Sequence, residues 1–278
     1  MRTVDGATRS HGSASDLIVA AVGGSFAAGP GIKPVTDKAA GRSGRNAAHL
    51  VSRALGGRLV DVSVSGATTA NVLHEAQRIR SHSFRPQIES VLPGTDLVLV
   101  TAGGNDLQYI GSMVARAKAN TLRGRRITRS FGRQMLNRST LVMPSEYHRL
   151  RTATSLERIV VECRRRAPAS RVLLVDYLPV LHAGSVEGPA LPFTSAEIRH
   201  FRELAAMLST AIETAAFQTG ADLLPASAYG TENCVGSENP YTRGFEKHFG
   251  DGTAFHPTGA GMERVADGIL ALLGSNAD

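Results

Sequence analysis

Short apolar runs alternate with longer amphipathic stretches along most of this chain. The first run, residues 17–22, is apolar throughout and ends in two glycines, which is typical of a strand buried on both faces of a sheet. Similar runs follow at 58–65, 96–101, 171–177 and, more briefly, 221–225. Strands that alternate with helices build βαβ units. The alternation therefore predicts a mainly parallel, doubly wound α/β domain.

The stretches between these runs have helical spacing. Helices are predicted at 46–55, 69–78, from 154, from 194 and at about 258–273. Two of these starts, Thr154 and Thr194, belong to capping boxes, in which the threonine accepts from a free helical N–H and a glutamate reaches back. The sequence contains no internal repeat and no linker, so that one domain is expected.

Length and composition set the boundaries of that domain. The 278 residues are 42 % apolar and 20 % charged, which is ordinary for a globular protein. A chain of this size buries about 75 % of its unfolded surface, so its core needs neither a disulfide nor a metal. Residues 1–15 are polar, and we expect a frayed arm there and one domain over 16–278. The arm lacks the apolar stretch of a secretory signal, and no apolar run approaches the roughly 18 residues that span a bilayer.

The net charge of +7 is concentrated in one segment. Residues 116–151 contain ten basic side chains and one acid, Glu146, which gives +9 for this basic insertion and leaves −2 for the rest. The protein is therefore not globally basic, and no nucleic-acid partner is expected. The insertion is either a solvated face or a lid over the cleft with apolar contacts, and weak contact with anionic surfaces is a further interpretation. Its candidate apolar contacts are Leu136, Leu141, Val142 and Met143.

Two cysteines, Cys163 and Cys234, have no Cys or His neighbours at a zinc-ligand spacing, so no metal site is predicted. Cys163 lies in an amphipathic stretch, where a buried free thiol is expected, and a disulfide between the two cysteines stays open. So few cysteines in a chain of this length fit a reducing compartment slightly better than an oxidising one.

Four segments carry residues that could perform chemistry. Three follow predicted strands, at the sheet edge where ligands bind in such folds, and the fourth precedes the last helix. They are 23–29 (GGSFAAG), 65–69 (SGATT), 103–106 (GGND) and 255–259 (FHPTG). Each has an ordinary structural explanation when taken alone, because glycines make turns, Asn and Asp cap helices, and a histidine before proline is commonly a loop residue.

Nucleotide-binding and α/β-hydrolase motifs do not account for the first segment. Gly24 and Gly29 have the spacing of a phosphate-binding loop, but Pro30 stands where that loop needs its lysine. The Gly-x-Gly-x-x-Gly fingerprint of dinucleotide binding is absent. The Gly-x-Ser-x-Gly elbow of α/β-hydrolases fails because Ala27 fills the last position.

Taken together, the four segments supply Ser25, Gly66, Asn105 and His256 in that order. In this they resemble the SGNH branch of the GDSL esterase and lipase family, which is named for these four residue types. The likeness extends over residues 16–273 and includes the stretches GGSFAAGPG, RSGRNAAHL, DVSVSGATT, TAGGNDL and FHPTGAGM. The resemblance implies a three-layer α/β/α domain that hydrolyses small-molecule or lipid esters of carboxylic acids without a metal or cofactor.

The resemblance also implies a role for each of these residues. Ser25 would be the nucleophile, and His256 would be the general base that takes its proton near neutral pH. The tetrahedral intermediate carries an oxyanion that needs donors fixed in advance. The backbone N–H groups of Ser25 and Gly66 and the side-chain amide of Asn105 would be these donors.

Two positions depart from the family pattern. Gly24 stands where the family usually has an aspartate before the serine, and Thr253 stands where it usually has one three residues before the histidine. The nearest acid is Asp251. We expect a Ser25–His256 dyad whose histidine is oriented by the backbone carbonyl of Thr253, with the Asp251 carboxylate as the alternative.

Other functions compatible with the sequence are an acyltransferase that uses the same Ser25 and His256, and a catalytically silent relative that binds acidic partners through the basic insertion. Secreted relatives of this branch carry cysteines where this chain has Ala39-Ala40 and Val64. Together with the missing signal, this favours a cytoplasmic location.

Overall fold

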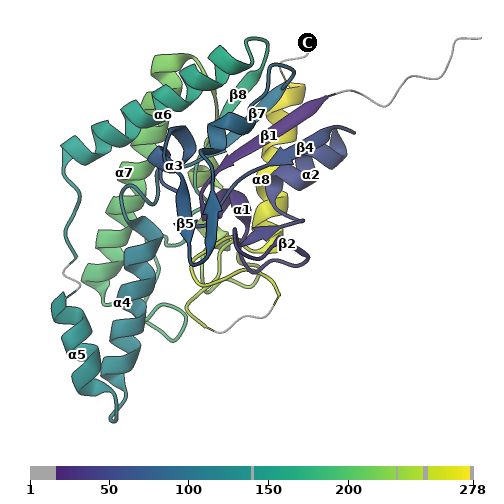
Figure 1. The fold of residues 1–278 in the computed structure, drawn as a ribbon. Coiled ribbons are helices and arrows are strands. Elements are labelled where there is room, and N and C mark those ends of the chain that lie inside the picture. The colour runs from purple at the N-terminus through teal and green to yellow at the C-terminus, as the bar shows by residue number, and fades with distance from the viewer. Residues whose placement is uncertain (1–16, 139–140, 230, 247–249, 276–278) are drawn as a thin grey trace, which may run out of the picture.

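A five-stranded parallel sheet forms the centre of the computed structural model, which describes residues 17–138, 141–229, 231–246 and 250–275 (Figure 1). The predicted arm at 1–15 lies outside the described residues. The strand order is β4-β1-β7-β8-β9. The strands are β1 (Ile18–Gly23), β4 (Arg58–Asp61), β7 (Leu97–Thr101), β8 (Arg171–Val175) and β9 (Asp222–Leu224). Four of them fall within the predicted apolar runs and β1 extends one residue beyond its run, and their parallel pairing confirms the α/β fold.

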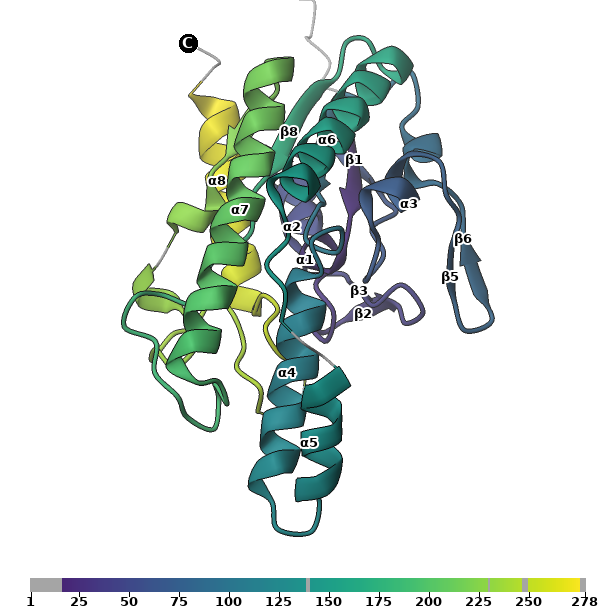
Figure 2. The ribbon, with the colours of Figure 1, turned by 90° about the vertical axis from the view of Figure 1, so that its left-hand side faces the viewer.

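Helices cover both faces of this sheet, which gives three layers (Figures 1 and 2). On one face α2 (Ala47–Ala54) packs against α8 (Gly259–Gly274), and on the other α6 (Glu146–Arg166) packs against α7 (Ser195–Thr219). Every residue of β7 is buried, which explains why its sequence LVLVT shows no polar alternation.

Capping fixes the ends of the long helices. Thr194 accepts from the N–H of Glu197 at 3.3 Å while the Glu197 carboxylate accepts from the N–H of Thr194 at 2.8 Å, which confirms the predicted start of α7. The predicted start at Thr154 is wrong, because α6 begins at Glu146 and Thr154 lies inside it. The buried face of α6 already includes Thr152 and Ala153, so packing extends the helix beyond the capping motif.

The predicted helix at 69–78 is shorter than expected. α3 (Thr69–Leu73) ends after five residues, and β5 (Gln77–Ile79) then pairs antiparallel with β6 (His82–Phe84). A second small antiparallel ribbon pairs β2 (Val35–Asp37) with β3 (Arg42–Ser43). The remaining short elements are α1 (Ser25–Ala28) and the 3-10 turns η1 (Gln87–Ser90), η2 (Ala226–Ala228) and η3 (Thr231–Asn233).

Much of the basic insertion forms a helical hairpin. α4 (Tyr109–Gly124) and α5 (Arg129–Arg138) lie side by side and extend away from the body of the protein (Figures 1 and 2). Gly132 makes their close approach possible, because a Cβ at this position would lie 2.3 Å from the backbone nitrogen of Arg123. After the hairpin the chain returns to the body, where Leu141 and Met143 pack against the main core and Val142 is exposed.

Both cysteines are buried and neither forms a disulfide, so the open question of a disulfide is answered in the negative. Burial raises the pKa of Cys163 to about 12 and that of Cys234 to about 11. None of the described helices combines the length and the apolar character needed to cross a bilayer.

Candidate active site

Ser25 lies at the carboxyl edge of the sheet, just after β1, the second of its five strands. The order of the strands reverses here, because β1 lies between β4 and β7. The loop is tied to both neighbours: the N–H of Gly24 donates to the carbonyl of Thr101 at 2.9 Å, and the N–H of Val64 donates to the carbonyl of Gly23 at 3.1 Å. Such a switch point is the usual place for a ligand in open α/β sheets.

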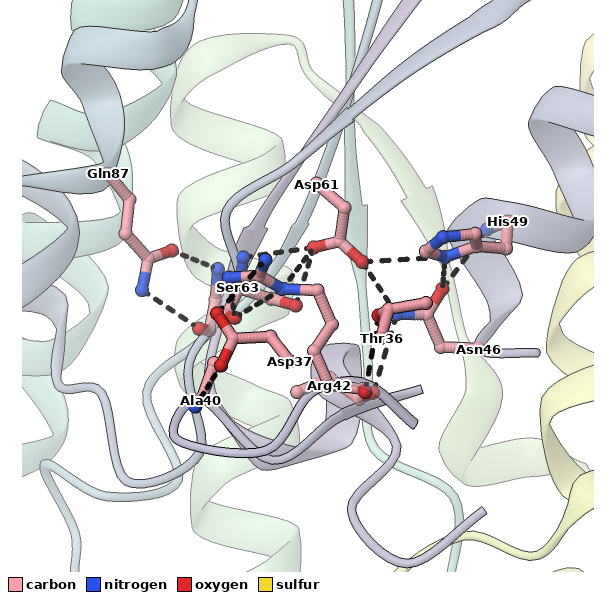
Figure 3. A network of polar contacts seen from close by, with 11 residues as sticks. Thr36, Asp37, Ala40, Arg42, Asn46, His49, Asp61, Ser63 and Gln87 are labelled. Atoms are coloured by element: carbon pink, nitrogen blue, oxygen red, sulfur yellow. Dashed lines mark hydrogen bonds and ion pairs between the residues drawn. The ribbon is translucent and has the colours of Figure 1, made fainter. Parts of the chain in front are cut away.

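Gly23 sets the direction in which the chain leaves β1. Its φ is +141°, and a Cβ there would lie 2.1 Å from the carbonyl oxygen of Thr101. The Gln87 side chain holds this residue with two hydrogen bonds (Figure 3): Oε1 accepts from the N–H of Gly23 at 2.6 Å, and Nε2 donates to its carbonyl at 3.1 Å. No sequence motif pointed to Gln87, yet it fixes the residue two positions before Ser25.

The Ser25 hydroxyl lies 2.9 Å from Nε2 of His256, so the structure brings together the two predicted reacting groups. The ring of Phe26 contacts the rings of Tyr177 and His256, with centroid separations of 4.5 and 5.7 Å. Desolvation lowers the pKa of His256, and the carbonyl of Ala254 opposes this in part. The imidazole is therefore neutral near pH 7, as a proton acceptor must be.

The second ring nitrogen, Nδ1, contacts the carbonyl of Ala254 at 2.8 Å and the hydroxyl of Thr253 at 3.1 Å. This corrects the expectation that the Thr253 carbonyl orients the ring. That carbonyl accepts instead from the backbone N–H of His256 at 3.1 Å, in a turn that includes Phe255 at a φ of +60°. The acceptor is thus the carbonyl two residues before the histidine rather than three.

Asp251 is oriented away from the imidazole by other partners. Its carboxylate pairs with the guanidinium of Arg243 and accepts from the N–H of Gly259 at 2.6 Å, at the start of α8. Arg243 also holds the histidine loop through its backbone, because its N–H donates to the carbonyl of His256 and its carbonyl accepts from Phe255, both at 2.9 Å. Asp251 and Arg243 therefore brace the loop, which the sequence did not indicate for Arg243.

Asn105 follows β7 and turns toward the serine loop. Its Nδ2 donates to the carbonyl of Ala67 at 2.8 Å, and a Cβ on Gly24 would lie 3.0 Å from that nitrogen. A side chain at position 24 would therefore require the Asn105 amide to shift by a few tenths of an ångström. An amide nitrogen has two protons, so Asn105 keeps one for another acceptor.

Gly66 lies in an exposed turn with a φ of +83°. The turn is supported by Gln77, whose Nε2 donates to the carbonyl of Ser65 at 2.9 Å. The carboxylate of Asp106 then accepts from the N–H and hydroxyl of Thr69, at 3.0 and 2.5 Å. This link joins the loop of Gly66 to the loop of Asn105, and burial raises the pKa of Asp106 although the Thr69 bonds oppose the rise.

The buried carboxylate of Asp61, at the end of β4, supports the carboxyl edge of the sheet on the side of β1 opposite to β7 (Figure 3). Asp61 accepts from Nδ2 of Asn46 at 2.7 Å and from the hydroxyl of Ser63 at 2.6 Å. Arg42 lies over it and donates to the carbonyl of Ser63 at 2.8 Å. Because Asn46 caps α2, this network fixes that helix to the strand that precedes Gly66.

Chemically, the site offers a hydroxyl paired with a neutral imidazole and an amide donor close to the same loop. Within the residues that the structure describes, no group of three or more His, Cys, Asp or Glu side chains could hold a metal ion.

Comparison with known proteins places the chain among lipid and ester hydrolases. The GDSL-like lipase/acylhydrolase family matches residues 21–264. Lipase 2 of Streptomyces coelicolor is 30 % identical over an alignment of 264 positions, which covers 91 % of this chain and 85 % of that protein.

Two solved structures share the fold. Phospholipase A1 from Streptomyces albidoflavus superposes with a TM-score of 0.66 at 22 % identity, over 94 % of this chain and 99 % of that one. An extracellular lipase from Streptomyces rimosus gives a TM-score of 0.66 at 21 % identity, over 93 % and 99 % of the two chains.

Proposed function

The chain belongs to the GDSL-like lipase/acylhydrolase family, and we propose that it hydrolyses carboxylic esters with Ser25 as nucleophile and His256 as general base. One observation carries the assignment of these two residues: the 2.9 Å contact between the Ser25 hydroxyl and His256 Nε2 at the switch point of the sheet. A serine hydroxyl is a weak nucleophile until an adjacent base takes its proton, and a neutral imidazole is suited to this near neutral pH.

The proposed reaction has two halves. His256 Nε2 takes the hydroxyl proton while Ser25 Oγ bonds to the ester carbonyl carbon, whose π electrons move onto the carbonyl oxygen. The imidazolium then gives that proton to the alcohol oxygen as the C–O bond breaks, which leaves an acylated Ser25 and a free alcohol. Water repeats both transfers, so that the carboxylic acid leaves and the free hydroxyl returns.

We assign stabilisation of the oxyanion to the N–H groups of Ser25 and Gly66 and to the amide of Asn105. Ser25 is the first residue of α1, so its N–H has no acceptor within that helix. Gly66 lies in an exposed turn, where a substrate oxygen can approach the backbone. The Asn105 Nδ2 nitrogen, which has a second proton to donate, lies close to Gly24, next to the nucleophile.

The tautomer of His256 is held without a carboxylate in this proposal. With Nε2 facing the serine as acceptor, Nδ1 must carry the proton, and the carbonyl of Ala254 at 2.8 Å accepts it. The Thr253 hydroxyl at 3.1 Å is a second acceptor. The assignment is thus a Ser25–His256 dyad whose ring is oriented by uncharged oxygens.

For the substrate we propose an ester of a fatty acid. This rests on the family and on relatives whose names are lipase and phospholipase A1. The acyl length preferred by this chain follows from a panel of p-nitrophenyl esters of increasing chain length, assayed on the pure protein.

The Ser25→Ala variant tests the nucleophile. It should keep the fold and lose both ester hydrolysis and labelling by a fluorophosphonate probe, because only the attacking oxygen is removed. The exposed Ser130 on α5 provides the matched control, and Ser130→Ala should be labelled like the wild type. Equal labelling of the Ser25→Ala variant would contradict the assignment.

A further inference from the structure

The hairpin of α4 and α5 concentrates positive charge without any acid to balance it. Residues 107–145 contain eight Lys and Arg side chains and no Asp or Glu. Five arginines around the turn are exposed, and within the described part of the chain none of them has an ion-pair partner. These turn arginines are Arg123, Arg125, Arg126, Arg129 and Arg133. Together they carry a charge of +5, which is most of the net charge of +7 of the whole chain.

Large apolar side chains lie among these arginines. Ile127, in the turn itself, is 98 % exposed, and Phe131 in the first turn of α5 is 56 % exposed. A single exposed apolar residue is ordinary on a protein surface. Here, however, both occur within the most basic part of the chain and at the end of an element that projects from the body (Figure 2). Basic side chains around exposed apolar ones are typical of segments that bind at a lipid–water interface.

The hairpin presents these groups as one unit. Gly132 allows its helices to touch, and the Thr128 hydroxyl donates to the carbonyl of Leu122 at 2.7 Å across the turn. On one flank, a hollow of about 500 Å³ is lined by the guanidinium-bearing residues Arg123, Arg129 and Arg133. Several guanidinium groups around one hollow suit the oxygens of a phosphate group.

We propose that this hairpin docks the protein onto an anionic lipid surface. The turn arginines face lipid phosphates, while Ile127 and Phe131 enter the interfacial layer. A nucleic acid would satisfy the arginines but would give the isolated Ile127 no apolar surroundings, so the lipid surface accounts for both sets of side chains. The suggested purpose of docking, delivery of lipid esters to Ser25, rests on the proposed function. The attraction of the hairpin to an anionic lipid surface does not depend on that function. α4 begins four residues after Asn105, so docking keeps the candidate site within about one helix length, ~24 Å, of the lipid.

Vesicle co-sedimentation tests this docking, with Ser25→Ala as the parent so that no lipid is hydrolysed. The parent should bind vesicles of phosphatidylcholine mixed with phosphatidylglycerol and not those of phosphatidylcholine alone, and binding should weaken as salt rises. Replacing Arg125, Arg126 and Arg129 together by Gln should lower the partition coefficient about 100-fold. Ile127→Ser should lower it about tenfold with the arginines intact.

A matched triple variant controls for net charge. Arg53, Arg78 and Arg199 are exposed and lie outside the hairpin, and within the described residues they form no ion pair. Replacing them by Gln removes the same charge and should change partitioning by no more than about twofold. An equal loss in both triple variants would show diffuse attraction and overturn the proposal. So would absence of binding at low salt, or binding of a short DNA duplex as tight as that of the anionic vesicles.

Hydrolysis of a soluble short-chain ester by the variants in the wild-type Ser25 background is measured in parallel. It should be unchanged, because the hairpin carries none of the proposed reacting groups. If the wild type hydrolyses the soluble ester and the Ser25→Ala parent does not bind anionic vesicles, the docking proposal fails and the proposed function stands. If the parent binds the vesicles and the wild type hydrolyses no ester, the proposed function fails and the docking proposal stands.

Discussion

Replacing Thr253 by Asp would give His256 the charged partner that it lacks. The Thr253 hydroxyl lies 3.1 Å from Nδ1, so a carboxylate of similar reach would lie at about the same separation from the ring. Two opposite charges about 4 Å apart interact by about 4 kcal/mol at an effective dielectric constant of about 20, which corresponds to about three pKa units. Position 253 is exposed, and solvent screening reduces this to about one unit.

The sign of the effect follows from the role of the base. His256 must be neutral to accept the serine proton, so kcat/KM rises as pH passes through the pKa of His256. In the wild type, desolvation lowers that pKa, and the acid limb should lie below the ordinary value of about 6.5. In Thr253→Asp the limb should move up by about one unit. Above the limb the plateau should be higher, by no more than about tenfold, because the carboxylate stabilises the imidazolium that forms in the transition state.

The assay is a pH profile of kcat/KM on a p-nitrophenyl ester, with Thr253→Asn as the control of equal shape and no charge. The Asn variant should keep the wild-type limb. If the Asp and Asn variants titrate alike, either the residue at 253 does not reach the ring or His256 is not the base, and the reasoning fails.

Three further perturbations have definite expected outcomes. Asn105→Ala should lower kcat by about 10²–10³ with little change in KM, the loss of one oxyanion donor, and a lowered urea midpoint with unchanged turnover per folded molecule would instead show a structural role. Asp251→Asn should cost less than about tenfold in kcat, because its carboxylate contacts Arg243 and Gly259 rather than the ring, and a loss near 10⁴ with unchanged circular dichroism would identify a triad carboxylate. Gly23→Ala should destabilise the fold by about 3 kcal/mol or more, because its Cβ would meet the carbonyl of Thr101 in the central sheet. Gly220→Ala at the end of α7, where φ is also positive but no atom lies within 4 Å of the added Cβ, should cost only about 1 kcal/mol, and equal melting temperatures for the two variants would contradict this packing argument.

The sheet was predictable because its three inner strands are almost wholly buried and have continuous apolar runs. All five predicted runs became strands, in the parallel arrangement that the alternation predicts. Helix boundaries were less predictable where packing overrides a local motif. Thr154 has an ideal capping sequence but lies inside α6, and the pattern at 69–78 turns into a strand at Gln77.

The residues of the candidate site likewise differ in how far the sequence alone predicts them. Ser25 and His256 can be predicted as a pair because their segments have distinctive sequences, and the structure places the two side chains in contact. The acceptor on Nδ1 was placed one residue away, since a carbonyl belongs to every residue and leaves no mark in the sequence. Gln87 and Arg243 act on backbone atoms of distant segments, and only the folded chain shows those partners. The predicted cytoplasmic location stays a prediction.

Desolvation of the His256 ring has a consequence for the proposed hydrolysis. A weaker base is a stronger conjugate acid, so an imidazolium whose pKa is lowered donates its proton more readily than a free histidine does. The more acidic imidazolium favours departure of the alcohol, which takes up this proton, rather than attack by serine, which releases it. An aliphatic alkoxide is a poor leaving group and needs that proton, whereas a phenolate leaves without it. We therefore expect the proposed hydrolysis to discriminate less against esters of aliphatic alcohols than it would with a histidine of ordinary pKa.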